Sequence, residues 1–225
     1  MSAITDFRDY LSELAKRGDI EHIKRTVDPY LEASAITRRA TENGRRVPFF
    51  EHLSGAADGF RMVGAPGALS SIPGHPLARI SLSLGLPYTT TAAELVEHLV
   101  QAGSKPPLPP RQVDGASAPC KQNILLGEEA SLDRFPIPFV HQDDGGPYVN
   151  TWGVIAARTP DGRWTNWSIT RIMKIDARHM TGLVLPSQHI GMVWKEWEPI
   201  GEPMPFALIQ GGDPGIATVG GASGR

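Results

Sequence analysis

A set of polar side chains between residues 166 and 189 has the residue types that bind metal ions and anions. An amide oxygen, an imidazole and a carboxylate can together bind a divalent cation that also holds a phosphate, and an arginine can orient an anionic substrate. This pattern makes the set a candidate site. Its members are Asn166, Ser168, Thr170, Arg171, Gln188 and His189.

The same residues have a plainer interpretation. Asn, Ser and Thr on a strand are mostly solvated on the open face of an antiparallel sheet, and an isolated histidine is more often structural than a ligand. Trp152, Trp164 and Trp167 are likewise more typical of hairpin packing than of a stacking platform. Composition alone favours this interpretation, and both remain open at this point.

Several other catalytic motifs are absent from the sequence. It contains no His-Glu-x-x-His, no Cys-x-x-Cys and no Gly-x-Ser-x-Gly. Gly215 and Gly220 have the spacing of a phosphate loop, but Gly221-Ala222 replaces the Lys-Ser/Thr that would reach phosphate and magnesium. We therefore reject a nucleotide phosphate loop.

Composition and charge narrow the class of protein. The 225 residues carry 22 Lys and Arg against 24 Asp and Glu, a balance that builds no basic field for nucleic acid. One cysteine, Cys120, excludes an internal disulfide, and the first residues lack the pattern of a secretory signal. No apolar run approaches the roughly 20 residues of a membrane span. We expect a cytoplasmic protein with no nucleic-acid or membrane partner.

Regular elements must position the candidate residues. Apolar spacing predicts a helix over 6–17 capped by Thr5, and a second helix that begins at Asp28-Pro29 and ends near Gly44. A short buried strand follows at 47–50 and a third helix at 92–101. The proline-rich residues 105–111 predict a stiff connector between two domains.

The residue pattern of the second half is typical of a β domain. Residues 148–158 and 163–175 are joined by Thr159-Pro160-Asp161-Gly162, which predicts a hairpin. In a regular strand Asn166 and Ser168 share one face, whereas Arg171 points to the other. Because one pocket needs all three, we predict a bulge or bend between Ser168 and Arg171.

Several separate motifs resemble the UbiD-like family of prenylated-FMN-dependent (de)carboxylases, and its ferulate- and cinnamate-type decarboxylases in particular. The opening of the chain and its second half both contribute to the resemblance. The matching strings are Asp6–Leu11, Val47–Glu51, Pro119–Asn123, His141–Gly146, Asn150–Gly153, Thr165–Arg171 and Gln188–Gly191.

The resemblance implies roles for individual residues. Asn166 and His189 would bind a Mn²⁺ or Mg²⁺ ion that anchors the cofactor phosphate, and Arg171 would be the catalytic arginine. A neighbouring K⁺ ion would be held by Trp167, Ala222 and Ser223. The residues that would contact prenylated FMN are Ser168, Ile169, Thr170, Arg171, Gln188 and His189.

The resemblance also implies a reaction and partners. The chain would be a carboxy-lyase that decarboxylates an α,β-unsaturated or aromatic carboxylic acid without net oxidation, with its cofactor supplied by a flavin prenyltransferase. In this family a third metal ligand and two catalytic glutamates lie beyond the position that matches Arg225. We therefore expect the chain alone to be inactive, with a homo-oligomer or a complementary carboxyl-terminal subunit as its partner.

The resulting prediction is an α+β fold in two domains. Residues 1–110 would form a mixed α/β domain, and residues 111–225 would form an incomplete split β-barrel that binds prenylated FMN. The alternative functions are a non-catalytic flavin-binding or assembly subunit of a split decarboxylase, and a plain flavin oxidoreductase.

Overall fold

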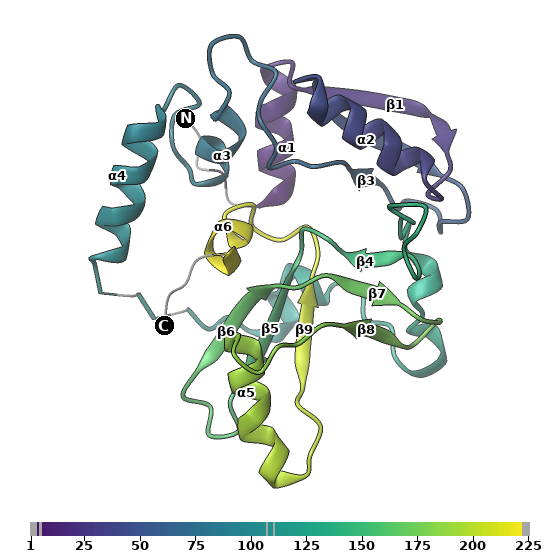
Figure 1. Ribbon diagram of the computed structural model, residues 1–225, viewed down its shortest axis with the longest axis vertical. Coiled ribbons are helices and arrows are strands. Elements are labelled where there is room, and N and C mark those ends of the chain that lie inside the picture. The colour runs from purple at the N-terminus through teal and green to yellow at the C-terminus, as the bar shows by residue number, and fades with distance from the viewer. Residues whose placement is uncertain (1–3, 5, 107, 110, 222–225) are drawn as a thin grey trace.

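The computed structural model describes residues 4, 6–106, 108–109 and 111–221, and its first unit is a small mixed sheet with helices (Figure 1). The sheet has the order β1-β2-β3, with β1 and β2 parallel and β3 antiparallel to β2. The elements are α1 (Phe7–Lys16), β1 (Ile20–Val27), α2 (Glu32–Glu42), β2 (Val47–Leu53), β3 (Met62–Val63), α3 (Ala78–Ser83) and α4 (Ala92–Gly103).

Helices cover both faces of this sheet. Phe49 belongs to an apolar cluster with Tyr10 and Leu14 of α1, whereas its neighbour Phe50 packs with Ala33 of α2. Successive side chains of a strand point to opposite faces, so β2 is buried on both sides. The predicted strand at 47–50 is confirmed, and it continues to Leu53.

The first two helices differ from the prediction at their starts. Asp6 caps α1 through a 2.8 Å bond from the Asp9 amide to its carboxylate, whereas the predicted cap, Thr5, lies outside the described residues. The predicted start of the second helix at Asp28-Pro29 is wrong, because α2 begins only at Glu32. Leu31 precedes it with φ 64°, a left-handed conformation that breaks the helical path.

A buried ion pair fixes the loops of the amino-terminal unit. The Arg79 guanidinium donates to both Asp19 carboxylate oxygens, at 2.8 Å from Nε and 2.7 Å from Nη2. The hydroxyls of Ser70 and Ser71 donate to the same carboxylate. Burial raises the pKa of Asp19, but the hydrogen bonds from Arg79, Ser71 and Ser70 lower it by more, so its pKa lies below the usual range.

Residues 104–147 contain only short turns of 3₁₀ helix among those that the structure describes. The turns are η1 (Gly115–Ser117), η2 (Pro119–Lys121), η3 (Gly127–Glu129) and η4 (Leu132–Arg134). Consistent with the prediction, no described residue of 105–111 lies in a helix or strand. Proline cannot donate to a regular ladder, which accounts for this irregularity.

The second unit consists of two three-stranded antiparallel sheets, β4-β7-β8 and β6-β5-β9. The predicted α+β class is confirmed. No helix among the described residues is long and apolar enough to cross a membrane. The elements are β4 (Tyr148–Asn150), β5 (Val154–Arg158), β6 (Thr165–Ile169), β7 (Ile172–Lys174), β8 (Met180–Gly182), α5 (His189–Trp197), η5 (Glu198–Ile200), β9 (Phe206–Ile209) and α6 (Ile216–Gly221).

Several contacts join the units, among them a hydrogen bond of 3.3 Å from Ala57 N to Arg134 O and the rings of Phe60 and Phe135, with centroids 5.1 Å apart. Tyr30 and Phe139 form a parallel bridge, with hydrogen bonds of 3.0 Å from Leu31 N to Phe139 O and from Phe139 N to Pro29 O. Trp152, before β5, lies directly over Gly67, since a Cβ on that glycine would come within 2.3 Å of the indole ring.

Candidate functional site

The predicted hairpin holds the first candidate residues. β5 and β6 pair antiparallel with Arg158 opposite Thr165 and Ala157 opposite Asn166. The turn is closed by a 2.9 Å bond from Thr159 N to Trp164 O, and Asp161 accepts from the Thr159 hydroxyl at 2.7 Å. The Pro-Asp-Gly turn therefore sets the register that orients β6.

Asn166 and Ser168 share the inner face of β6, as their spacing predicts. Asn166 is 5% exposed, and its Nδ2 donates to Ser168 Oγ at 2.5 Å. Its Oδ1 accepts no hydrogen bond within the described chain, which leaves an amide oxygen available to a cation. Asn166 therefore does not have the solvated position that the plainer interpretation requires.

The chain changes sheets between Ser168 and Arg171, which confirms the predicted local irregularity. β6 ends at Ile169 and pairs with β5, whereas β7 starts at Ile172 and pairs with β4 and β8. The link consists of Thr170 and Arg171. It frees Arg171 from the strict alternation of a strand.

Asn150 holds this link in place. Its buried amide Nδ2 donates to Thr170 O at 2.7 Å and to Gly153 O at 3.0 Å. Gln210, just after β9, donates from Nε2 to Asn150 Oδ1 at 2.6 Å. One side chain thus joins the ends of β4, β6 and β9, a role that the sequence motif containing Asn150 did not reveal.

His189 is the first residue of α5, which packs against β6. Its ring meets Trp164 edge to face, with centroids 5.5 Å apart and planes at 73°. No described residue hydrogen-bonds to either ring nitrogen, so both nitrogens are available to a ligand as far as the described chain is concerned. The exposed Gln188 is the N-cap, and the first-turn amides that follow it favour an anion.

Gly191 allows α5 to start where it does. A Cβ at this position would lie 2.0 Å from Leu185 O and 2.9 Å from Pro186 Cα. The backbone of 185–186 therefore crosses the first turn of α5 at a distance that only glycine permits. This close approach positions His189.

The remaining predicted residues lie around the same strand. Arg171 is exposed and forms no ion pair with the described residues. Trp167 and Ile169, 41% and 38% exposed, occupy the face of β6 opposite Asn166, and Thr170 is half-buried in the link. Ala222 and Ser223 lie outside the described residues.

Sequence analysis missed helix α6, which covers this opposite face. A Cβ on Gly220 would lie 3.1 Å from Val154 Cγ2 and 3.5 Å from Ile169 Cγ1. α6 therefore packs on β5 and β6 through glycine, which brings the two backbones close. Figure 1 shows α6 (yellow) toward the upper ends of these strands and α5 toward their lower ends.

The donor atoms of the described residues do not complete a divalent metal site. Among the described residues no group of three or more His, Cys, Asp and Glu gathers for a metal ion. Asn166 and His189 supply two suitable ligand types on adjacent elements, without a direct contact between them in the described chain. Their predicted convergence on one ion stays a prediction.

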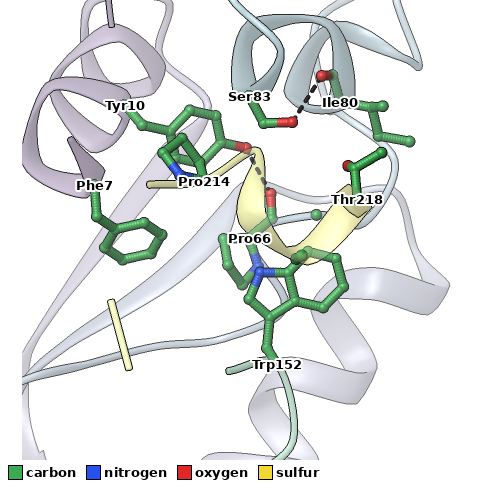
Figure 2. A pocket seen from close by; sticks show the side chains of 10 residues that line it. Phe7, Tyr10, Pro66, Ile80, Ser83, Trp152, Pro214 and Thr218 are labelled. Atoms are coloured by element: carbon green, nitrogen blue, oxygen red, sulfur yellow. Dashed lines mark hydrogen bonds between the residues drawn. The ribbon is translucent and has the colours of Figure 1, made fainter. Parts of the chain in front are cut away.

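Two hollows of the described chain lie elsewhere, between the units. A groove of about 630 Å³ runs along Phe49, Arg61 and Tyr148, and a pocket of about 220 Å³ lies between Trp152 and Thr218. Figure 2 shows Tyr10, Trp152 and α6 around the smaller one, with the Tyr10 hydroxyl donating to Pro66 O at 2.8 Å. None of the predicted site residues that the structure describes lines either hollow.

Comparison with known proteins identifies the family. The 3-octaprenyl-4-hydroxybenzoate carboxy-lyase Rift-related domain of UbiD matches residues 111–224, and the N-terminal domain of the same family matches residues 11–99. The chain belongs to the UbiD family. The two small antiparallel sheets are thus those of the UbiD Rift-related domain, and the resemblance seen in the motifs is confirmed.

Individual UbiD relatives agree with this assignment. Ferulic acid decarboxylase 1 of Saccharomyces cerevisiae is 41% identical over 217 residues, which are 95% of this chain and 43% of the relative. Pyrrole-2-carboxylic acid decarboxylase of Pseudomonas aeruginosa is 35% identical over 216 residues, 96% of this chain and 43% of the relative. The chain spans less than half the length of these curated relatives.

A solved structure extends the likeness to the fold. It is an evolved dimeric form of the UbiD-class enzyme HmfF from Pelotomaculum thermopropionicum in complex with prFMN. The TM-score is 0.82 at 27% identity, over 98% of this chain and 47% of that one.

Proposed function

We propose that this chain carries the cofactor-anchoring part of a UbiD-type decarboxylase that acts on an α,β-unsaturated or aromatic carboxylic acid with prenylated FMN. The observation that carries the proposal is the arrangement at β6 and α5. A buried amide, an imidazole without a local hydrogen bond and an exposed arginine lie on adjacent segments of the Rift-related domain.

The relatives support the cofactor and the substrate class. The HmfF structure contains prFMN, and the curated relatives are named for decarboxylation of ferulic acid and pyrrole-2-carboxylic acid. A small carboxylic acid is therefore the proposed substrate, and a separate flavin prenyltransferase the proposed supplier of the cofactor.

Each candidate residue has a distinct task in this proposal. Asn166 and His189 would hold a Mn²⁺ or Mg²⁺ ion, and the first-turn amides of α5 would favour the negative charge of the cofactor phosphate. Ser168, Ile169, Thr170 and Gln188 contact the flavin. Prenylated FMN, when bound, supplies the electron-accepting centre for loss of carbon dioxide.

Arg171 orients the substrate carboxylate. A guanidinium binds a carboxylate through two parallel hydrogen bonds, and the link between β6 and β7 lets this side chain turn independently of both strands. A neighbouring K⁺ ion would be held near Trp167, Ala222 and Ser223.

Three single variants test these assignments. The protein is purified, together with any carboxyl-terminal polypeptide that completes it, from a host that makes prenylated FMN; the flavin absorbance that co-elutes with it is measured, and carbon dioxide release from cinnamate and from pyrrole-2-carboxylate is followed. His189→Ala and Asn166→Ala should lose about 10–100-fold in cofactor affinity, as metal-site variants do. Arg171→Ala should keep the flavin and lose turnover.

The matched control is His179→Ala, since His179 is exposed and pairs only with Asp176 on a loop before β8. Flavin retention by His189→Ala equal to that of His179→Ala would contradict the site. Wild-type protein that retains flavin but releases no carbon dioxide from any acid would favour the alternative, a non-catalytic flavin-binding or assembly subunit.

A further inference from the structure

Residues 96–126, termed here the docking segment, lie on the outside of the molecule. Leu95 is the last buried residue before it, at 9% exposure. Within the segment Gly115 and Ala118 are half-buried, and every other described residue is exposed. So long a stretch without a buried side chain is unusual in a compact domain.

Apart from bonds at its two ends, within helix α4 and from Glu129 N to Leu126 O at 3.1 Å, the docking segment forms no hydrogen bond to the rest of the described chain. Its bonds are internal, such as Ser104 N to Val100 O at 3.1 Å and Lys121 N to Ala118 O at 2.9 Å. Attachment resumes only after it, where Arg178 pairs with Glu128 and Leu132 N donates to Ala177 O at 2.8 Å. The segment is thus held at its two ends alone.

The exposed side chains of the docking segment are typical of a surface that another polypeptide covers. Val96, Leu99 and Val100 form one exposed stripe on α4, at 60%, 41% and 63% exposure. Further along, Ile124, Leu125 and Leu126 are 61%, 40% and 75% exposed. Clusters of exposed large apolar side chains mark interaction sites.

The chemistry of α4 argues against a membrane surface. The helix carries Glu94 and Glu97 and contains no lysine or arginine, whereas helices that lie on membranes are rich in both. A second copy paired through α4 alone would cover one stripe and leave 124–126 exposed. An extended partner, with about 20–30 residues a side in the interface, matches the length of the segment better.

We propose that the docking segment binds the carboxyl-terminal polypeptide of a UbiD-type enzyme. The family's N-terminal domain matches residues 11–99, and this chain spans only 43% of its curated relatives. The relatives therefore carry more polypeptide outside the compared part than within it. Apolar, poorly hydrogen-bonded segments of this kind resemble one half of an obligate interface. The inference does not depend on the proposed decarboxylation.

Site-specific photo-crosslinking in the natural host tests this inference on the protein as it is made there. Leu99 and Leu125 are each replaced by p-benzoyl-phenylalanine, and the crosslinked peptides are identified by mass spectrometry. The expected partner peptide aligns with the relatives beyond their matched part, in the same chain or in another. The control position is Leu69, which is 57% exposed outside the segment and should give at least about tenfold less of that crosslink.

Hydrogen exchange supplies a second measurement. Amides of 96–126 should exchange at least about tenfold more slowly in the natural gene product than in the isolated 225 residues, because docking excludes water from them. Crosslinks to residues 1–225 of another copy, to an unrelated protein or to nothing would overturn the proposal. So would an equal yield at Leu69, or equal exchange rates.

Discussion

Gly191→Ala is the sharpest perturbation of the candidate site, because it acts on backbone and not on a ligand. The new Cβ would lie 2.0 Å from Leu185 O, whereas a carbon–oxygen contact needs about 3.3 Å. The start of α5 must therefore move by about 1.3 Å relative to residues 185–186. Overpacking of this kind costs about 1–3 kcal/mol, more than the roughly 1 kcal/mol that alanine gains over glycine in a helix.

The shift moves His189 and Gln188 together, so cofactor binding should weaken along with stability. We expect urea unfolding to show a loss of up to about 2 kcal/mol, and flavin titration to show at least about tenfold weaker binding. Gly103→Ala is the matched control, since nothing lies within 4 Å of a Cβ at this helical position, and it should be neutral or slightly stabilising. A Gly191→Ala protein with wild-type stability and flavin affinity would refute the reasoning.

Three further predictions concern buried contacts elsewhere in the described chain. Asp19→Asn should cost about 3–5 kcal/mol at neutral pH, because it leaves Arg79 buried without its carboxylate. Since the pKa of Asp19 is lowered by folding, its contribution is lost as pH falls below about 4, and the difference from wild type measured by urea unfolding should shrink there. Gly67→Ala should push Trp152 aside, so a double-mutant cycle with Trp152→Ala should give a coupling of about 0.5–3 kcal/mol. Asn150→Ala should cost about 1–3 kcal/mol for each of the two carbonyls that it leaves unbonded, measured by thermal unfolding.

Each of these predictions has its own contrary outcome. A gap between wild type and Asp19→Asn that persists unchanged at pH 3 would exclude the titration argument. Additive effects of Gly67→Ala and Trp152→Ala would show that the two residues do not press on one another. Unchanged stability of Asn150→Ala would mean that the junction of the sheets does not depend on its amide.

Local patterns allowed much of the fold to be predicted. Apolar spacing located α1 and α4, and the Pro-Asp-Gly turn located the hairpin of β5 and β6. The shared face of Asn166 and Ser168 follows from the period of a strand. These features depend on residues that are close in sequence, which is why they could be predicted from it.

Features that depend on distant partners were missed or misplaced. α2 starts three residues later than Pro29 suggested, because residues 29–31 are bonded to Phe139. α6 lies in a glycine-rich stretch that lacks helical propensity, and it packs through Gly220 on Val154 and Ile169. Tertiary contacts override local preference in both cases.

The bridge between Tyr30 and Phe139 also has a consequence for synthesis on the ribosome. The amino-terminal sheet is complete once β3 has emerged, but the left-handed Leu31 and the start of α2 are held by bonds to a residue made more than a hundred positions later. At about 5–20 residues per second, Phe139 follows Leu31 by about 5–20 s. During that interval the nascent chain carries an unsecured α2, so translation speed through residues 32–139 sets how long chaperones have access to it.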